Sequence, residues 1–185
     1  MATENIAAAW LRVQTVLQRK PQAGVHDDAP ATARWHGDLR VVASHANGTQ
    51  IASDMPKELG GTGDQVTPGW LFRAGLASCF ATCIAMHAAA QGIALDVLEV
   101  RATSRSDLRG LFGMAAADGA PVGPGPIETH LEVRVGAPGI APERLTGLVE
   151  QSYRCSPISA ALRDAVPVSL AIELEGVQAQ TGAER

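Results

Sequence analysis

One long helix is predicted between residues 67 and 92, in the run TPGWLFRAGLASCFATCIAMHAAAQG. Thr67 and Pro68 are residue types favoured at a helix N-cap and first helical position, and Gly92 is the type that ends a helix. A stripe at helical spacing contains Phe72, Leu76, Cys79, Cys83 and Met86, and the opposite side carries Ala74, Ala81, Ala85 and Ala88. A helix that is apolar or small on every side is usually buried. We therefore expect it to form the centre of the molecule.

The N-terminal third carries signals for one helix and three strands. Residues 4–20, with Thr3 as cap, predict an amphipathic helix that docks on its own domain or on a partner subunit; its stripe is Ile6, Trp10, Val13 and Leu17. Residues 21–30 form a linker by composition. Alternating residues predict strands at 32–36, 39–44 and 49–53. The Asn47-Gly48 pair between the last two is typical of a hairpin turn.

The C-terminal half continues in the same mixed pattern. Strands are predicted at residues 94–106 and 129–135, with a loop or broken hairpin over residues 110–125 between them. A helix opens at Pro142, with Leu145, Leu148, Val149 and Ser152 facing inward; it reaches Cys155, is interrupted by Pro157 and resumes over residues 160–162. A last strand carries Val166, Val168, Leu170, Ile172 and Leu174.

This order of elements predicts an α+β fold with antiparallel sheets around the central helix. We divide the chain into an N-terminal helix and linker (residues 1–30), one folded domain (31–178) and a polar tail (179–185).

Composition narrows the function classes. The 185-residue chain has a net charge of −4 and three cysteines, and its pI is near 5.7. No basic stripe is present to neutralise phosphates, so we do not expect a nucleic-acid partner. The start of the chain does not resemble a secretory signal, and Arg73 and His87 make the central helix a poor membrane span. An odd number of cysteines is not typical of a disulfide framework. These features favour a cytoplasmic protein without a membrane partner.

The cysteines are the leading candidates for chemistry. Cys79 and Cys83 are one helical turn apart, a spacing that suits a disulfide poorly. They are either small buried hydrophobic residues or reactive thiols that meet another cysteine through the fold. His87, one turn further on, either activates a thiolate or is a satisfied histidine near the helix end. Ligand spacing for zinc is absent and we expect no metal or cofactor.

Two other groups of residues have compositions that can indicate a binding site. The glycine-rich segment 55–66 precedes a helix but lacks the lysine and spacing of a phosphate-binding loop. Arg101, Arg105 and Arg109 are expected to form a solvated face.

Several short runs resemble the OsmC/Ohr family of thiol-dependent organic hydroperoxide reductases. The matching runs are residues 33–35 and 37–39, Gly60-Gly61-Thr62, Pro68 with Leu71-Phe72, residues 77–80, residues 155–159 and Ala161-Leu162. They extend over about three quarters of the chain, from residue 33 to residue 165.

The resemblance implies an intertwined homodimer with active sites at the subunit interface. It implies that Cys79 attacks an organic hydroperoxide and becomes a sulfenic acid. Cys155 then condenses with it to a disulfide, and a dithiol reductant restores both thiols.

Three positions differ from the family pattern. The family's peroxidases carry a glutamate ten residues before the reactive cysteine, where this chain has Gly69. They also use an arginine from the preceding loop, and here Lys57 or Arg40 would have to replace it. Cys155 lies one position early, because Ser156 separates it from Pro157. One step on a helix turns a side chain by about 100°, so Cys83 is a second candidate for the resolving thiol.

Three functions follow as hypotheses. The leading one is thiol-dependent reduction of organic hydroperoxides in oxidative-stress defence. The alternatives are a non-catalytic dimer that binds a small apolar ligand between subunits, and a redox sensor that uses Cys79 and Cys155 as a switch.

Overall fold

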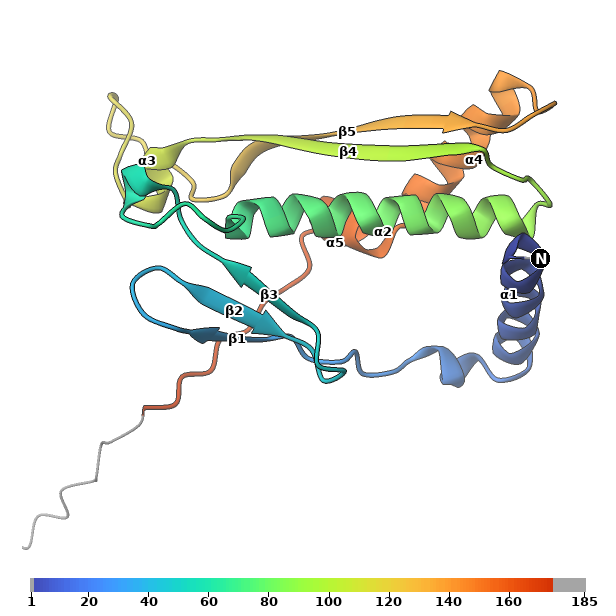
Figure 1. Cartoon of the computed structure of the whole chain (residues 1–185), viewed down its shortest axis with the longest axis horizontal. Helices are drawn as coiled ribbons and strands as arrows, with labels where there is room; N and C mark the ends of the chain where they lie inside the picture. The colour runs from blue at the N-terminus through green and yellow to red at the C-terminus, as the bar shows by residue number, and fades with distance from the viewer. Residues whose placement is uncertain (1, 175–185) are drawn as a thin grey trace, which may run out of the picture.

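The computed structural model describes residues 2–174 and has the predicted α+β architecture (Figure 1). The helices are α1 (Ala2–Arg19), α2 (Pro68–Ala90), α3 (Leu108–Leu111), α4 (Pro142–Cys155) and α5 (Pro157–Arg163), with two short 3-10 turns, η1 (Pro21–Gly24) and η2 (Lys57–Leu59). The strands are β1 (Thr32–Trp35), β2 (Val41–Ser44), β3 (Gln50–Ser53), β4 (Val97–Ser106) and β5 (Pro126–Gly136). The end of the predicted domain and the polar tail lie outside the described residues.

Helix α2 begins and ends where its sequence signals predict. The Thr67 side chain accepts a hydrogen bond from the Trp70 amide at 3.2 Å, which satisfies one of the unpaired donors at the helix start. Pro68 is the first helical residue. Gly92 follows the helix with a φ of 67°, a left-handed conformation that favours glycine.

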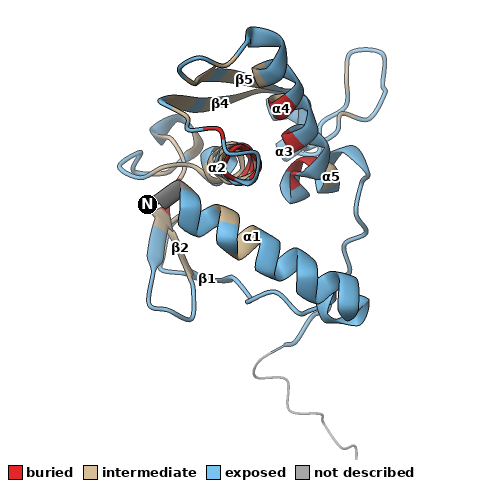
Figure 2. Cartoon of the chain, turned by 90° about the vertical axis from the view of Figure 1, so that its right-hand side faces the viewer, coloured by how far each residue is buried: buried red, intermediate tan, exposed pale blue. Residues whose placement is uncertain are grey.

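Three parts of the chain pack against α2 (Figure 2). The β4–β5 hairpin lies on one side, α4 and α5 lie on another, and α1 packs near the end of α2 that carries His87. The core is formed by Phe80, Ile84, Ala88, Ile93 and Leu148. The hydrophobic residues of the two strands and α4 pack around it.

Burial of α2 is one-sided within this chain, which corrects the expectation of a helix buried on all sides. Trp70 and Met86 remain 48% and 39% exposed. The buried positions are Leu76, Phe80, Ile84, His87, Ala88 and Ala89. By length and composition alone α2 is apolar enough to cross a membrane, a property that the core helices of soluble proteins share.

The predicted meander forms a three-stranded antiparallel sheet in the order β1-β2-β3. Trp35 pairs with Val41, and Ser44 pairs with Gln50 across the Asn47-Gly48 turn. Gly48 has a φ of 92°, which explains why the turn requires glycine. The sheet delivers the chain to the loop that precedes α2 (Figure 1).

The second sheet is the long β4–β5 hairpin, as predicted. Its connection contains α3 and an isolated bridge between Ala115 and Pro121, which fits the expected broken hairpin. The three arginines on its surface are exposed and paired with carboxylates: Arg101 with Glu132, Arg105 with Glu128 and Arg109 with Asp107. This confirms their assignment to a solvated face.

Two predictions about helices and strands are wrong: the cap of the first helix and the last strand. Helix α1 begins at Ala2, so Thr3 lies inside its first turn and is not the cap. Residues 166–174 form no strand. Their alternating side chains are exposed, with Val168 at 95% and Leu170 at 84%. A strand needs the hydrogen-bonding edge of another strand, and the described part of this chain pairs none with the segment.

Candidate active site

Cys79 lies in the middle of α2 and contacts the junction of α4 and α5. Its Sγ is 3.5 Å from the Oγ of Ser156. Ser156 is fully buried and ends α4 at the same residue that precedes α5. Pro157 at the first position of α5 fixes this helix start. The fold therefore brings a hydroxyl from the C-terminal helices against the thiol of the central helix.

A second serine supports this contact. The buried Ser159 donates a hydrogen bond from its Oγ to the Oγ of Ser156 at 3.0 Å. A serine hydroxyl has one proton and two acceptor lone pairs. With a lone pair of Ser156 occupied by Ser159, the Ser156 proton is available for the sulfur of Cys79. The arrangement suits stabilisation of a thiolate or of an oxidised sulfur.

Cys83 joins this group from the next turn of α2. Its thiol donates to the carbonyl oxygen of Cys155 at 3.9 Å, and its side chain also interacts with those of Cys79 and Ser156. Burial raises the pKa of the Cys83 thiol above its ordinary value, and the neighbouring Cys79 and Cys155 raise it further. Cys83 is therefore a neutral hydrogen-bond donor and not a ready nucleophile.

Cys155 is the last residue of α4, and its side chain is exposed. All three cysteines are free thiols in this structure. The structure therefore brings Cys79 and Cys83 together with the main chain of Cys155, while Ser156 makes the contact with Cys79. Sequence reasoning did not identify Ser156 as a site residue. Its available signal was the Ser156-Pro157 pair, which is typical of a helix start.

The two cation candidates lie in the region that leads into α2. Arg40 donates to Thr62 Oγ1 at 3.1 Å and to the carboxylate of Asp64, and its guanidinium is 3.7 Å from the carboxylate of Asp54. Lys57 is exposed on η2. Neither makes a hydrogen bond to a thiol within residues 2–174 of the structure. Their predicted catalytic roles stay predictions.

Asp54 is the centre of the loop that Arg40 holds. Its buried carboxylate accepts from the Met55 amide at 2.7 Å, the Thr62 amide at 2.9 Å and the Thr62 hydroxyl at 2.5 Å. The hydrogen bonds from Thr62 hold the pKa of Asp54 below its ordinary value. The hydrogen bond from Arg40 lowers the pKa of Asp64 to about 2. The charges of Arg40, Asp54 and Asp64 therefore hold the backbone of the loop that leads into α2.

Gly69 stands at the position where the family's peroxidases carry a glutamate, and the structure has room for a side chain there. A Cβ added at Gly69 would lie 3.7 Å from Arg73 Nη1 and 3.9 Å from Thr67 Oγ1. Arg73 instead donates to Ser104 Oγ at 3.1 Å and so ties α2 to β4.

His87 is a satisfied core histidine, the second of the two hypotheses for this residue. Its Nδ1 lies 2.8 Å from the carbonyl oxygen of Cys83 and 3.3 Å from Ser152 Oγ. Because Ser152 donates to the Leu148 carbonyl, it accepts from a protonated Nδ1. The ring packs against Trp10 of α1, with centroids 5.0 Å apart. His87 therefore anchors α1 and does not face Cys79.

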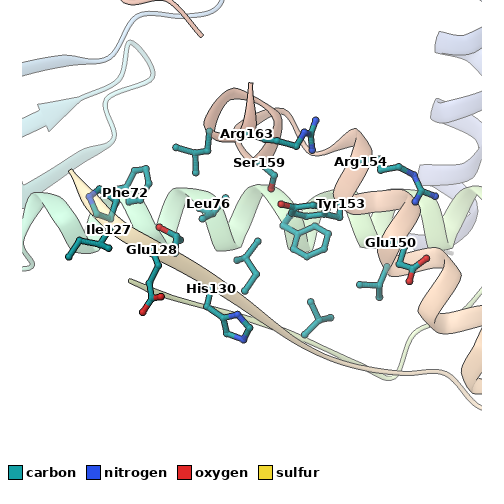
Figure 3. Close-up of a pocket in the computed structure, with 17 residues that line it drawn as sticks. Phe72, Leu76, Ile127, Glu128, His130, Glu150, Tyr153, Arg154, Ser159 and Arg163 are labelled. Carbon is teal, nitrogen blue, oxygen red and sulfur yellow. The ribbon is translucent and has the colours of Figure 1, made fainter. Parts of the chain in front are cut away.

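A groove of about 780 Å³ runs between α2, β5, α4 and α5 (Figure 3). Phe72, Leu76 and Phe80 line it from α2, and Tyr153 packs edge-on against Phe80 with centroids 5.6 Å apart. Cys79 is not among the lining residues. Ser159 is, and it connects the groove to Ser156 and hence to Cys79. No local sequence pattern indicates this groove, because its residues come from four elements.

A metal centre is not supported: residues 2–174 contain no group of three histidine, cysteine or acidic side chains placed to hold an ion.

Comparison with known proteins identifies relatives. The model of the OsmC-like protein family matches residues 61–171. The organic hydroperoxide resistance protein of Xanthomonas axonopodis pv. citri (strain 306) is 31% identical over 145 residues, covering 78% of this chain and 92% of the relative. The protein of the same name from Xanthomonas campestris pv. phaseoli gives the same values.

Solved structures agree on the fold. An OsmC-like protein from Mycoplasma pneumoniae is 20% identical, covers 75% of this chain and 89% of its own, and has a TM-score of 0.62. An organic hydroperoxide resistance protein OsmC from Legionella pneumophila is 24% identical, with 75% and 91% coverage and a TM-score of 0.54. Together with the family model and the Xanthomonas relatives, these likenesses show that the chain belongs to the OsmC-like protein family.

Proposed function

We propose that this protein reduces organic hydroperoxides with the thiol of Cys79, in a peroxide-defence role. The observation that carries the proposal is the free Cys79 on the central helix, in contact with the buried hydroxyl of Ser156. The relatives named organic hydroperoxide resistance proteins support the substrate class. We place this activity in the cytoplasm, where reduced thiols are maintained.

The first chemical step uses the thiolate of Cys79. It attacks the distal oxygen of the hydroperoxide, the O–O bond breaks, and the alkoxide leaves and takes up a proton to become an alcohol. Cys79 is then a sulfenic acid. The hydroxyl of Ser156 lies within hydrogen-bond distance of this sulfur and can donate to it.

The groove suggests how an organic substrate is selected. Its wall of Phe72, Leu76 and Phe80 would hold an apolar chain by removing its surface from water. Ser159 at its edge lies one hydrogen bond away from Ser156. A hydroperoxide with an apolar tail therefore has a binding surface that hydrogen peroxide cannot use.

The decisive experiment is stopped-flow oxidation of the reduced protein by cumene hydroperoxide and, separately, by hydrogen peroxide. We expect fast oxidation that prefers the organic peroxide and is lost in Cys79→Ser. Cys155→Ser is the matched control and should be oxidised at the wild-type rate in this first step. Oxidation no faster than that of a free cysteine, or no difference between the peroxides, would reject the proposal.

A homodimer belongs to this proposal. Residues 166–174 present an extended apolar edge, and Trp70 and Met86 leave part of α2 uncovered. A second copy that receives the segment as an added strand would cover both. In light scattering, Leu170→Asp combined with Ile172→Asp should shift the protein to monomers. Ser169→Asp, on the other face of the segment, should not. Monomeric wild-type protein would refute this assembly.

The second candidate function is binding of a small apolar ligand without turnover. The groove supports it, because its aromatic wall does not require a reactive thiol. A fluorescent fatty acid that binds wild type and Cys79→Ser equally, with no peroxide consumption by either, would favour this alternative. Leu76→Glu should abolish that binding by placing a charge in the apolar wall.

A further inference from the structure

At the junction of α4 and α5, the group that contacts Cys79 is the hydroxyl of Ser156 and not a thiol. Ser156 Oγ lies 3.5 Å from Cys79 Sγ and is held in place by Ser159. Cys155 precedes Ser156 in the chain. Ser156 has extended dihedral angles, with φ −74° and ψ 115°. Side chains of successive residues diverge along the backbone, so the contact of Ser156 with α2 directs the Cys155 side chain elsewhere.

The hydrogen bond between Cys155 and α2 is made by its carbonyl group. Its oxygen accepts from the Cys83 thiol at 3.9 Å, so the main chain of Cys155 faces α2. The side chain of Cys155 is exposed. To form a disulfide with Cys79, the exposed Cys155 side chain would have to turn from solvent toward a sulfur that the buried Ser156 already contacts.

Cys83 is no better placed to close a disulfide with Cys79. Residues four apart on a helix have Cβ atoms about 5–6 Å apart. A disulfide needs Cβ atoms about 3.5–4.5 Å apart. Closing this gap would break the hydrogen bonds of the central helix beside its most buried turn. The raised pKa of Cys83 also keeps it protonated near neutral pH, which slows its attack on a sulfenic acid.

We propose that Ser156 holds the sulfenic acid of Cys79 and that an external thiol reduces it directly, without a Cys79–Cys155 disulfide. The inference rests on the proposed function and specifies the reductant step of the same site. Ser156 is here a positioning residue in the place where a resolving thiol would stand. A monothiol is then sufficient as reductant, although a dithiol also serves.

The reaction balances with two equivalents of monothiol. The first thiol attacks the sulfur of the Cys79 sulfenic acid: an S–S bond forms, the S–O bond breaks, and hydroxide leaves as water with the proton of the thiol. The second thiol attacks this mixed disulfide at the external sulfur and releases Cys79 as a thiol. In sum, one hydroperoxide and two thiols give one alcohol, one water and one external disulfide.

The test replaces Ser156 by a thiol. Reduced wild type, Ser156→Cys and Cys155→Ser are treated with one equivalent of cumene hydroperoxide in the presence of dimedone, and the products are mapped by mass spectrometry. We expect wild type and Cys155→Ser to be trapped by dimedone at Cys79 to the same extent. Ser156→Cys should lose most of this trapping and form an internal disulfide between residues 79 and 156.

A second arm measures turnover with 2-mercaptoethanol as the reductant. Wild type and Cys155→Ser should consume cumene hydroperoxide at the same rate, and a mixed disulfide of 2-mercaptoethanol with Cys79 should be detectable. Loss of turnover in Cys155→Ser, or a Cys79–Cys155 or Cys79–Cys83 disulfide in the wild type, would overturn the inference while leaving the peroxidase proposal intact.

Failure of the proposed function gives a different result. If cumene hydroperoxide leaves Cys79 unmodified in the wild type, both proposals fall. The oxidant diamide then still reports on the geometry: absence of a disulfide in Ser156→Cys would show that residue 156 does not face Cys79.

Discussion

Two polar regions adjoin the central helix, and they differ in the groups that hold them: charged side chains in one and neutral side chains in the other. The loop of residues 54–64 is held by full charges, with Arg40 between the carboxylates of Asp54 and Asp64. The thiols of α2 are held by neutral partners: Cys79 contacts the hydroxyl of Ser156, and Cys83 donates to the carbonyl oxygen of Cys155. Of the two cations predicted to act on the thiol, Arg40 is paired with these carboxylates and Lys57 is exposed.

This difference suggests that the two regions have different roles, one in stability and one in the reactivity of the thiol. Charged hydrogen bonds are strong and directional, and in the loop they fix the backbone that leads into α2. A thiol next to neutral donors is activated less than a thiol next to an arginine. We therefore expect the loop to govern stability and the Ser156 junction to govern chemistry, and each of the following changes tests that division.

The largest effect on the loop should come from Gly61→Ala. The added Cβ would lie 1.8 Å from the Met55 carbonyl oxygen, so the backbone of the loop must move. We expect the free energy of unfolding to fall by about 1–3 kcal/mol, the usual cost of overpacking, or more. Gly147→Ala is the control in α4. Its added Cβ meets no atom within 4 Å, and it should raise stability by up to about 1 kcal/mol. Urea denaturation measures both; an unchanged Gly61→Ala would refute the tight loop.

The next largest effect is expected from Arg40→Ala. Removing the guanidinium leaves Asp54 and Asp64 without their cation, so we expect a lower melting temperature. The rate of Cys79 alkylation by iodoacetamide at neutral pH should not change. Lys57→Ala, on an exposed side chain of the same loop, should change neither quantity. Slower alkylation of Cys79 in Arg40→Ala would show that this arginine acts on the thiol and would break the division.

Acid should weaken the same loop. The folded-state pKa of Asp64 is about 2, below the ordinary value of about 3.9. A carboxylate with a lowered pKa contributes stability that is complete above about pH 4 and is lost as pH falls toward 2. We expect wild type to lose stability through this window more steeply than Arg40→Ala. Equal slopes for the two proteins in urea denaturation between pH 5 and pH 2 would contradict this assignment.

The sequence predicts those features of the fold that depend on neighbouring residues. Thr67, Pro68 and Gly92 mark the ends of α2 because capping and left-handed turns are local. Asn47-Gly48 marks a hairpin for the same reason. Residues 166–174 show the limit: their alternation is correct for a strand, but a strand also needs an edge, and no edge is encoded within nine residues.

The candidate site shows the same limit at longer range. Cys79 and Cys83 are found from their spacing and from the family resemblance, since both lie on one helix. Cys155 and Ser156 are adjacent, so their side chains point in different directions. The orientation of the end of α4 therefore decides that Ser156, and not Cys155, contacts Cys79. The pairing of Arg40 with Asp64 joins residues 24 apart across a loop. Neither contact follows from periodicity.

The smallest expected effect concerns Cys83. Burial, together with Cys79 and Cys155, raises the pKa of its thiol, so its thiolate forms at a higher pH than that of an ordinary cysteine. We expect the alkylation of Cys83, followed by mass spectrometry over a series of pH values, to have a midpoint above the ordinary value of a cysteine thiol, about 8.5. Cys79→Ser removes one neighbouring thiol and should move the Cys83 midpoint slightly downward, toward the ordinary value. Burial is the larger cause, so most of the shift should persist. A Cys83 midpoint at or below the ordinary value would instead make Cys83 a competent second nucleophile beside Cys79, and the description of the α2 thiols as held by neutral partners would have to be abandoned.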